Sequence, residues 1–383
     1  MRIAVLKERR PGETRIAASP DTVKKLVGLG CRVTIERGAG NAANFSDADF
    51  TNAGAAIAMD ATTACAEADV VFKVLRPMCA AEGGFDEVAM LRRGSTLIAH
   101  LSALTQKDTV QALAAQGVTS FAMELMPRIS RAQAMDVLSS QSNLAGYKAV
   151  IDAAATFGRA MPMMMTAAGT IAPARVLIFG AGVAGLQAIA TAKRMGAVVY
   201  ATDVRYAVKE QVESLGGKFI VVDEEKMKAA ETSGGYAKEM DEDFKRKQAD
   251  AVHAEVLKAD IIITTALIPG KPAPRLVTAE MVAHMKSGSV IVDLAAEAGG
   301  NVEGTRTDEV IVTPNGVTIL GYANLPTRLA RDASALFAKN VFNFVTPMID
   351  KASGTFNVNW DDELVKGTLI TKDGQIVYPG LRG

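Results

Sequence analysis

Short apolar runs alternate along the chain with segments whose apolar residues recur at three- and four-residue steps. Near-continuous apolar runs are typical of parallel strands buried on both faces, and the three- and four-residue steps predict helices. The alternation occurs twice. The first set of expected strands is 2–6, 32–35, 70–75, 96–101 and 119–125, and the second is 176–179, 198–202, 219–222, 261–265 and 290–293. This order predicts an α/β protein with two doubly wound, Rossmann-like domains, parallel sheets and an interdomain cleft.

Two helical patterns indicate where the chain crosses between these domains. One lies in the second half of "LSSQSNLAGYKAVIDAAATFGRA", and the other begins at Thr327. The tail from Gly354 contains strand-like pieces around a turn, and we expect it to pack on the first domain. The first domain is therefore predicted to comprise residues 1–143 and 328–383, and the second domain residues 144–327.

Composition excludes several classes of function. The 383 residues include 42 Lys and Arg and 42 Asp and Glu, so no net basic field favours a nucleic-acid partner. Cys31, Cys65 and Cys79 lack metal-ligand spacing, which predicts buried thiols in a reducing compartment and no metal site. The apolar stretch 176–192 carries no charge, but it is interrupted by glycines and falls short of the roughly 20 apolar residues that a membrane helix needs.

The most specific local motif is "VLIFGAGVAGLQAIATAKRMGAVVYATD". Gly180, Gly182 and Gly185 form G-x-G-x-x-G between an expected strand and an expected helix, and the next strand ends in Asp203. This context predicts a dinucleotide site, with the pyrophosphate at the helix N-terminus. A carboxylate at position 203 would accept hydrogen bonds from ribose hydroxyls and repel a 2′-phosphate, which favours NAD(H) over NADP(H). We expect Arg205 to flank the adenine or the ribose.

The stretch "MPRISRAQAMDVLSSQSN", 126–143, gathers many hydrogen-bonding groups in a chain that is otherwise rich in small apolar residues. It begins after an expected strand end of the first domain, so it is predicted to face the cleft. Gln133 and Ser139 suit a carboxamide and a ribose, Arg128 and Arg131 suit phosphate, and Asp136 suits the orientation of an arginine.

None of these groups is an obvious proton carrier, and this restricts the chemistry. Oxidation of an alcohol or an amine requires a base for the released proton, commonly His, Lys or a carboxylate. Hydride exchange between two nicotinamide rings releases no proton at the reacting atoms, and it requires alignment and exclusion of water.

The segment 223–250 is crowded with charges of both signs and is too long for an ordinary connection. It is interpreted either as a solvated helical hairpin or as a mobile lid. In the second case Gly234 and Gly235 are the flexible point and Tyr236 is the tip.

Along essentially its whole length, the chain resembles the NAD(H)-binding α subunit of proton-translocating NAD(P) transhydrogenases. The similar segments are "KERRPGETRIAASP", "MELMPRISRAQAMDVLSSQSNLAGY", "MMMTAAGT", "AETSGGYAKEM" and "TTALIPGKPAP". The resemblance implies a mobile loop at 223–250 and a catalytic set of Arg128, Gln133, Asp136, Ser139 and Tyr236. The residues expected to contact NAD(H) are Arg128, Ile129, Ser130, Arg131, Gln133, Gly180, Gly182, Val183, Ala184, Gly185, Asp203, Val204, Arg205, Gly235, Thr265, Ala266 and Leu267.

The same resemblance implies partners. NADP(H) would bind a separate subunit, and membrane-spanning subunits would carry protons. Hydride would pass from NADH on this chain to NADP⁺ on the partner. The chain itself is expected to be a cytoplasmic homodimer, peripheral on the cytoplasmic side of the inner membrane through its partners.

A weaker resemblance to alanine dehydrogenase gives the alternative function, an NAD-dependent amino-acid dehydrogenase. Arg15 stands where that enzyme binds the substrate carboxylate, and Lys73 and His100 stand where it has groups near the reacting carbon. Two departures oppose this alternative: Glu297 replaces an expected aspartate, and the polar stretch 126–143 is foreign to that enzyme. A third possibility is a non-catalytic NAD-binding module.

Overall fold

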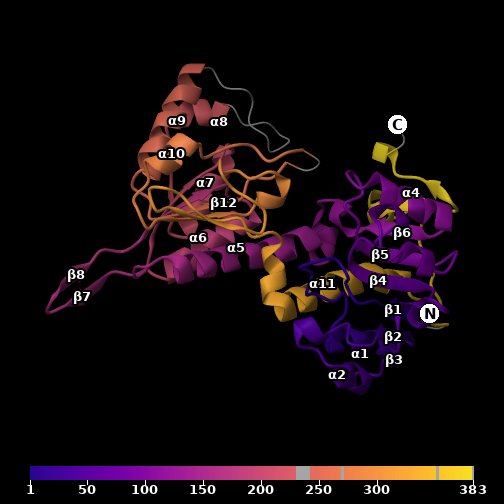
Figure 1. Ribbon diagram of the computed structural model, residues 1–383. Coiled ribbons are helices and arrows are strands. Elements are labelled where there is room, and N and C mark those ends of the chain that lie inside the picture. The colour runs from indigo at the N-terminus through magenta and orange to yellow at the C-terminus, as the bar shows by residue number, and fades with distance from the viewer. Residues whose placement is uncertain (230–241, 269–270, 351–352, 382–383) are drawn as a thin grey trace. The chain divides into compact units, whose positions relative to one another are not determined.

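The structure is a computed structural model that describes residues 1–229, 242–268, 271–350 and 353–381. The chain forms two compact units (Figure 1). Unit 1 comprises Met1–Gln141 and Thr327–Gly383, and unit 2 comprises Ser142–Pro326.

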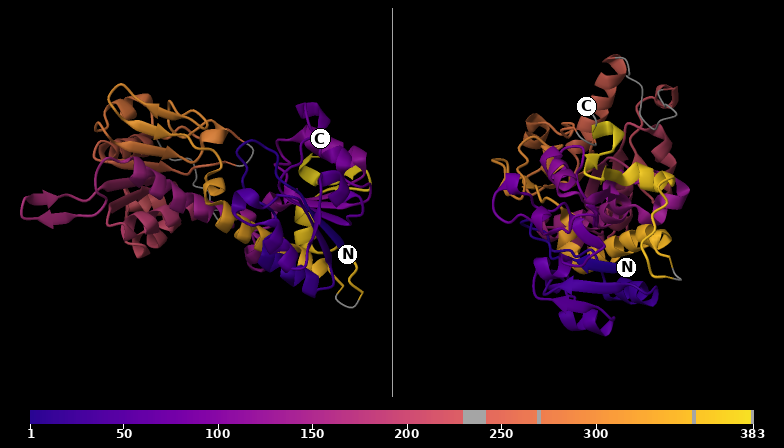
Figure 2. Two further views of the ribbon diagram at one scale, coloured as in Figure 1. Left: turned by 60° about the horizontal axis from the view of Figure 1, so that its bottom comes forward. Right: turned by 90° about the vertical axis from the view of Figure 1, so that its right-hand side faces the viewer.

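Unit 1 is built on an eight-stranded sheet in the order β17-β16-β6-β5-β4-β1-β2-β3. The strands β1 to β6 are parallel to their neighbours. Their bounds are β1 (Arg2–Val5), β2 (Arg32–Glu36), β3 (Ala56–Ala58), β4 (Val70–Leu75), β5 (Thr96–His100) and β6 (Thr119–Ala122). The C-terminal strands β16 (Leu369–Lys372) and β17 (Gln375–Ile376) extend this sheet in antiparallel pairing beyond β6 (Figure 2).

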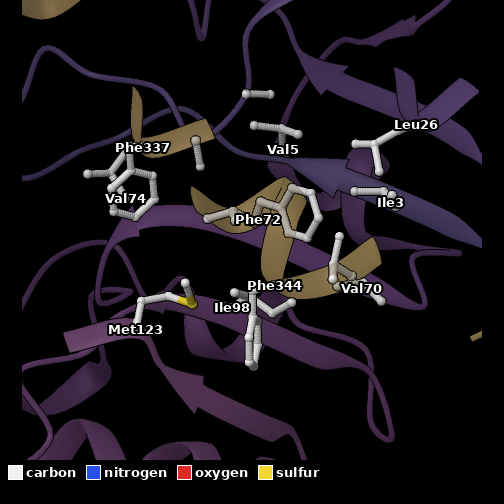
Figure 3. Close-up of a cluster of buried hydrophobic side chains, with 14 of the residues drawn as sticks. Ile3, Val5, Leu26, Val70, Phe72, Val74, Ile98, Met123, Phe337 and Phe344 are labelled. Carbon is white, nitrogen blue, oxygen red and sulfur yellow. The ribbon is translucent and has the colours of Figure 1, made fainter. Parts of the chain in front are cut away.

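Alternate residues of these strands enter separate cores, as the buried parallel pattern requires. Ile3, Val5 and Phe72 belong to one core together with Phe337 and Phe344 of α11 (Figure 3). Their strand neighbours, such as Ala4, Leu6 and Val71, belong to the other. The helices of unit 1 are α1 (Pro20–Gly28), α2 (Asp47–Asn52), α3 (Ala61–Cys65), α4 (Lys107–Gln116), α11 (Ala330–Val345) and α12 (Glu363–Thr368).

Unit 2 is built on a seven-stranded sheet in the order β11-β10-β9-β12-β13-β15-β14. All neighbours are parallel except β14 and β15. The bounds are β9 (Arg175–Phe179), β10 (Val198–Thr202), β11 (Lys218–Phe219), β12 (Ile261–Thr264), β13 (Val290–Asp293), β14 (Val310–Val312) and β15 (Thr318–Leu320). The helices are α6 (Val183–Arg194), α7 (Lys209–Ser214), α8 (Glu224–Ala229), α9 (Glu242–Val256) and α10 (Ala279–Ala283), while α5 (Val137–Thr156) runs from unit 1 into unit 2.

A two-stranded antiparallel hairpin, β7 (Met164–Thr166) and β8 (Gly169–Ile171), projects from the rest of unit 2 (Figure 1). Both strands are exposed along their whole length. The hairpin therefore adds nothing to the core of its own unit.

The prediction of two α/β units with parallel sheets is confirmed, with antiparallel strands at the sheet edges. The strand expected over 119–125 is too long, because residues 123–125 form a 3-10 turn. There the Glu124 carboxylate accepts hydrogen bonds from the backbone of Leu101 and Ala103, both at 3.0 Å. The strand expected at 219–222 is also wrong in its bounds, since only Lys218–Phe219 pairs.

The three cysteines are buried free thiols, as predicted. Among the described residues, no cluster of His, Cys, Asp or Glu has the geometry of a metal site. No helix of the described chain is both long and apolar enough to cross a bilayer.

Helices α5 and α6 approach each other closely at Gly146. A Cβ atom at this position would lie 2.0 Å from the carbonyl oxygen of Ala184, in the first turn of α6. Glycine is disfavoured inside a helix, so its presence in α5 reflects this backbone contact.

We predict that Gly146→Ala lowers the free energy of unfolding of unit 2 by about 1–3 kcal/mol, because the two helices must separate. Gly28→Ala is the matched control, since no atom of the described residues lies within 4 Å of its Cβ position in α1. That variant should keep or slightly raise stability. Urea unfolding followed by circular dichroism reports both units, and fluorescence of Trp360, the single tryptophan, reports unit 1. Equal stability of the two variants would contradict the prediction.

Candidate functional site

The three glycines of the G-x-G-x-x-G motif have different structural roles. Gly180 follows β9 with φ +93°, a conformation that favours glycine. A Cβ atom at Gly180 would lie 2.5 Å from Thr265 Oγ1, and one at Gly185 would lie 1.8 Å from the Gly180 carbonyl oxygen. These two glycines are therefore required by the turn and by the packing of α6 against it.

Neither the turn nor the packing of α6 requires glycine at position 182. Its φ is −78°, and no atom of the described chain lies within 4 Å of its Cβ position. It is the N-cap of α6, and its own lack of a side chain leaves this helix end without a side-chain cap. A helix N-terminus with an open approach over a glycine suits an anionic group such as a pyrophosphate. The residues present here fit a dinucleotide.

Asp203 lies directly after β10 and is held by its surroundings on every side. The Ala181 N–H donates to Oδ2 at 2.7 Å, which ties the carboxylate to the glycine turn. The backbone N–H and Nε of Arg205 donate to Oδ1 at 2.9 and 3.0 Å, and a terminal nitrogen of Arg205 donates to Oδ2 at 2.9 Å. Although burial raises the pKa of the Asp203 carboxyl, the hydrogen bonds from Arg205 and Ala181 lower it below its ordinary value. In the structure Arg205 thus binds Asp203 itself.

The neighbouring strand end closes the turn from the other side. Thr265 follows β12, and its hydroxyl lies 3.1 Å from the Phe179 carbonyl oxygen and 3.2 Å from that of Gly180. The side chain of Asn301 accepts from the Ala266 N–H at 3.0 Å and donates to the Ala266 carbonyl oxygen at 2.9 Å. The peptide groups on both sides of Ala266 are therefore fixed.

Asn301 and Asp293 were not predicted from the sequence. Both are fully buried. The Asp293 carboxylate accepts from the Thr264 and Thr305 hydroxyls at 3.0 and 2.8 Å and from the Ala295 and Val302 N–H groups, each at 3.0 Å. The signal of Asp293 in the sequence is a polar residue within an apolar run, which a buried position tolerates only with partners.

Three large apolar side chains are exposed around the glycine turn. Val183 begins α6, Val204 follows Asp203, and Leu267 follows β12. Their exposed fractions are 44%, 67% and 57%. Exposed apolar groups beside an open helix N-terminus offer contact surface for flat rings.

The polar stretch predicted from the sequence lies in unit 1 up to Gln141, and its backbone is anchored. Residues Ser130–Met135 form a 3-10 helix. The side-chain amides of Asn340 and Asn343 on α11 both donate to the Ala134 carbonyl oxygen, at 3.0 and 2.9 Å. Arg128 and Gln133 are exposed, and within the described chain no hydrogen bond holds their side chains. A fixed backbone therefore presents two polar side chains with open donors.

Two residues of this stretch have other partners than the sequence predicts. Asp136 was expected to orient an arginine, but it accepts from the N–H and hydroxyl of Ser139, at 2.9 and 2.5 Å, at the start of α5. Arg131 was expected to meet phosphate, but its guanidinium forms a bidentate pair with Asp362 at 2.7 and 2.9 Å. These hydrogen bonds hold the pKa of the Asp362 carboxyl below its ordinary value. In both cases a polar side chain of this chain is the partner, in place of the arginine or the phosphate that was expected.

Gly235 and Tyr236, the centre of the expected mobile loop, lie outside the described residues. The flanks of the charged segment are the helices α8 and α9. Ile129, Ser130 and Ala184 lie in the polar stretch or at the start of α6, as their sequence positions require.

Arg15, one of the residues of the alternative function, is already engaged. Its side chain is buried and pairs with Glu13 at 2.6 Å, while a second terminal nitrogen donates to the Gln141 side-chain oxygen at 2.8 Å. To bind a substrate carboxylate, Arg15 would have to give up a carboxylate that it already holds.

Lys73 is fully buried between two carboxylates. Its ammonium lies 2.9 Å from Glu87 Oε1 and 3.3 Å from Glu8 Oε2. Although burial lowers the pKa of Lys73, the carboxylates of Glu8 and Glu87 raise it above its ordinary value. A lysine held in the charged form is a poor proton acceptor. His100 ends β5 and is partly exposed, and Glu297 lies in a 3-10 turn after β13.

Comparisons with known proteins agree on one family. The family model described as alanine dehydrogenase/PNT, N-terminal domain, matches residues 4–145, and the corresponding C-terminal domain model matches residues 149–379. A relative from Rhodospirillum rubrum, named as the first part of NAD(P) transhydrogenase subunit alpha, is 63% identical over 383 residues, which cover 100% of this chain and 99% of that protein. An alanine dehydrogenase from Halomonas elongata is 30% identical over 384 residues, covering 99% and 95% of the two chains.

A solved structure gives the same picture. The crystal structure of transhydrogenase from Sinorhizobium meliloti matches with a TM-score of 0.87 and 49% identity, over 98% of this chain and 100% of that one. The resemblance to transhydrogenase α subunits that the sequence predicts is confirmed.

The separate roles of the glycines give a prediction. Gly182→Ala should leave the free energy of unfolding unchanged to within about 0.5 kcal/mol, because no described atom lies near the new methyl group. It should weaken NADH binding at least about tenfold if the pyrophosphate binds as the motif predicts, because the methyl group would then occupy its approach. Gly185→Ala is the comparison variant and should lose stability instead. Thermal unfolding measures the change in stability, and titration of NADH fluorescence measures the change in affinity. A destabilised Gly182→Ala protein would contradict the conclusion that neither the turn nor the packing requires Gly182.

Proposed function

Because the chain belongs to the alanine dehydrogenase/PNT family in both of its domains, we propose that it is the NAD(H)-binding subunit of a proton-translocating NAD(P) transhydrogenase. It passes hydride directly between NADH and NADP⁺ bound to a partner subunit. The observation that carries this proposal is the 63% identity to a transhydrogenase α subunit over the full length of both chains, about twice the 30% identity to the alanine dehydrogenase.

The glycine turn of unit 2 is the proposed binding site for NAD(H). The open helix N-terminus over Gly182 and Gly185 would receive the pyrophosphate, and Asp203 would receive the adenosine ribose. Val183, Val204 and Leu267 would contact the rings. Contacts with the backbone complete the site, which comprises Gly180, Gly182, Val183, Ala184, Gly185, Asp203, Val204, Arg205, Thr265, Ala266 and Leu267.

The polar stretch of unit 1 is proposed to contact the nicotinamide. Its open side chains support this role: Gln133 offers an amide to the carboxamide, and Arg128 offers a cation. Ser139, oriented by Asp136, suits a ribose hydroxyl. Ile129, Ser130 and Arg131 belong to the same stretch, and Gly235 and Tyr236, which lie outside the described residues, are proposed to belong to the NAD(H) site.

This arrangement suits hydride exchange between two nicotinamides. The bound nicotinamide supplies the hydride, and the protein needs only to align the ring and exclude water. Lys73 is held charged, and Arg15 is paired with Glu13, so neither is available as the amino-acid dehydrogenase alternative requires. The geometry therefore favours the transhydrogenase.

Further subunits belong to the proposal. The relative from Rhodospirillum rubrum is named as only the first portion of its α subunit, which supports the presence of other subunits. We propose that one binds NADP(H), that others span the membrane and carry protons, and that this chain lies on the cytoplasmic side of the inner membrane through them.

The projecting hairpin supports the proposed homodimer. Met163, Met164, Met165 and Ile171 are exposed on or beside β7 and β8, and Met165 is 78% exposed. Apolar side chains with no core of their own to join are typical of an interface, and methionine adapts to a partner surface.

The proposed chemistry predicts a specific defect for Gln133→Asn. Shortening the side chain should slow hydride transfer by about 10- to 100-fold, because it disturbs ring alignment, and NADH affinity should change less than about twofold. The assay mixes the chain with an NADP-binding transhydrogenase domain and follows hydride transfer from NADH to an NADP⁺ analogue. Gln375→Asn, an exposed glutamine on the edge strand β17, is the matched control.

Two further outcomes distinguish the alternative functions. Oxidation of L-alanine with NAD⁺ at ordinary enzyme rates, on the order of 1–10³ s⁻¹, would establish the amino-acid dehydrogenase instead. Tight NADH binding without hydride transfer beside the partner would establish a binding module.

The hairpin predicts the oligomeric state. Wild-type chain should sediment as a dimer, and Met165→Asp should dissociate it at micromolar concentration, because a charge would enter an apolar interface. Met59→Asp, at a similarly exposed methionine of unit 1, should leave the dimer intact. Sedimentation velocity measures both, and a dimeric Met165→Asp protein would exclude the hairpin as the interface.

A further inference from the structure

The acceptor capacity of Asp203 is fully used within the protein. A carboxylate offers about four lone-pair sites. Four donors occupy those of Asp203: the N–H groups of Ala181 and Arg205, Arg205 Nε, and one terminal nitrogen of Arg205. A ribose diol that donates to this carboxylate therefore has to replace donors that are already in place.

The guanidinium is the donor group that can leave. The Ala181 N–H belongs to the glycine turn, which is tied to β10 by the Gly180 N–H donating to the Thr202 carbonyl oxygen at 2.8 Å. The backbone N–H of Arg205 is fixed by the chain that continues into the turn Tyr206–Val208. The guanidinium is carried on a flexible stem, and the Arg205 side chain is 38% exposed while that of Asp203 is 6% exposed. The guanidinium can move into solvent, and the other donors stay.

We propose that Arg205 is a latch on Asp203 that NAD(H) must release, and that it thereby sets the selectivity between NAD(H) and NADP(H). The ribose hydroxyls take the two lone-pair sites that the guanidinium vacates. Because Arg205 is only two residues from Asp203 along the chain, the released cation stays in the neighbourhood of the carboxylate. This inference rests on the proposed function, because it concerns the same NAD(H) site.

The latch has opposite consequences for the two dinucleotides. NADH replaces the guanidinium at Asp203, so its affinity is reduced by the strength of that ion pair. NADPH carries a 2′-phosphate, which Asp203 repels and a released guanidinium attracts. Arg205 therefore weakens NADH binding and favours NADPH binding, and it limits the selectivity that Asp203 alone would give.

The test compares Arg205→Met with Arg194→Met. Methionine keeps an unbranched stem and removes the guanidinium. Arg194 is an exposed arginine at the opposite end of α6, roughly 16 Å along the helix from the glycine turn. The probes are NADH, NADPH and reduced nicotinamide mononucleotide, which lacks the adenosine half. Each is titrated by fluorescence, and circular dichroism checks the fold.

For Arg205→Met we expect NADH to bind about three- to tenfold more tightly, the range of a partly exposed charge-assisted pair. NADPH should bind at least about threefold more weakly, and the mononucleotide should bind unchanged to within about twofold. Arg194→Met should match wild type with all three probes. Unchanged or weaker NADH binding by Arg205→Met would overturn the latch. Failure of wild-type chain to bind NADH would refute the proposed function instead.

A second measurement uses the wild-type chain and does not depend on a variant that folds. The Arg205 Nε–H proton, bonded to Asp203 at an N to O distance of 3.0 Å, is expected to exchange slowly with water. Saturation with NADH should shift this ¹H–¹⁵N resonance and accelerate its exchange. A resonance that keeps its position and protection at saturation would overturn the proposal.

Discussion

The close backbone contact between β9, the glycine turn and α6 is the constraint on which the candidate site depends. The chain leaves β9, reverses at Gly180 and enters α6 with less space than any side chain would allow at Gly180 or Gly185. Gly146 of α5 extends the same requirement to the next helix. Because backbone meets backbone here, the amides of the first turn of α6 are presented at one open point, over Gly182. Neighbouring strand ends then complete the site: Asp203 is tied to the turn, and Thr265 closes it.

Ion pairs inside unit 1 determine which chemistry remains available. Arg15 and Lys73 have the charges that an amino-acid substrate would require, yet each faces carboxylates of this same chain. Burial makes these partners hard to give up, since an unpaired buried charge is strongly unfavourable. Arg15 and Lys73 as they stand are therefore poorly suited to binding a charged substrate or removing its proton.

In the polar stretch of unit 1, some side chains anchor the local structure and others are exposed. Arg131, Asp136 and Ser139 fix local structure through Asp362 and through each other, and two asparagines of α11 hold the backbone at Ala134. Among the described residues, no side-chain partner engages Arg128 or Gln133. In unit 2, Asp203 and Arg205 combine both roles, because one pair organises the turn and also controls access to the carboxylate.

The sequence by itself determined the alternation of strands and helices, the glycine motif with its acidic partner, and the location of the polar stretch. These features depend on local periodicity and on short motifs, which a linear chain displays directly. It did not determine which polar groups pair with one another: Arg131 with Asp362, Arg205 with Asp203, Ser139 with Asp136, and Asn301 with the backbone of Ala266. Such pairs depend on distances between side chains from separate elements, or on the choice among nearby partners. Only the packed tertiary structure decides them, because burial requires each polar group to find a partner within hydrogen-bond reach.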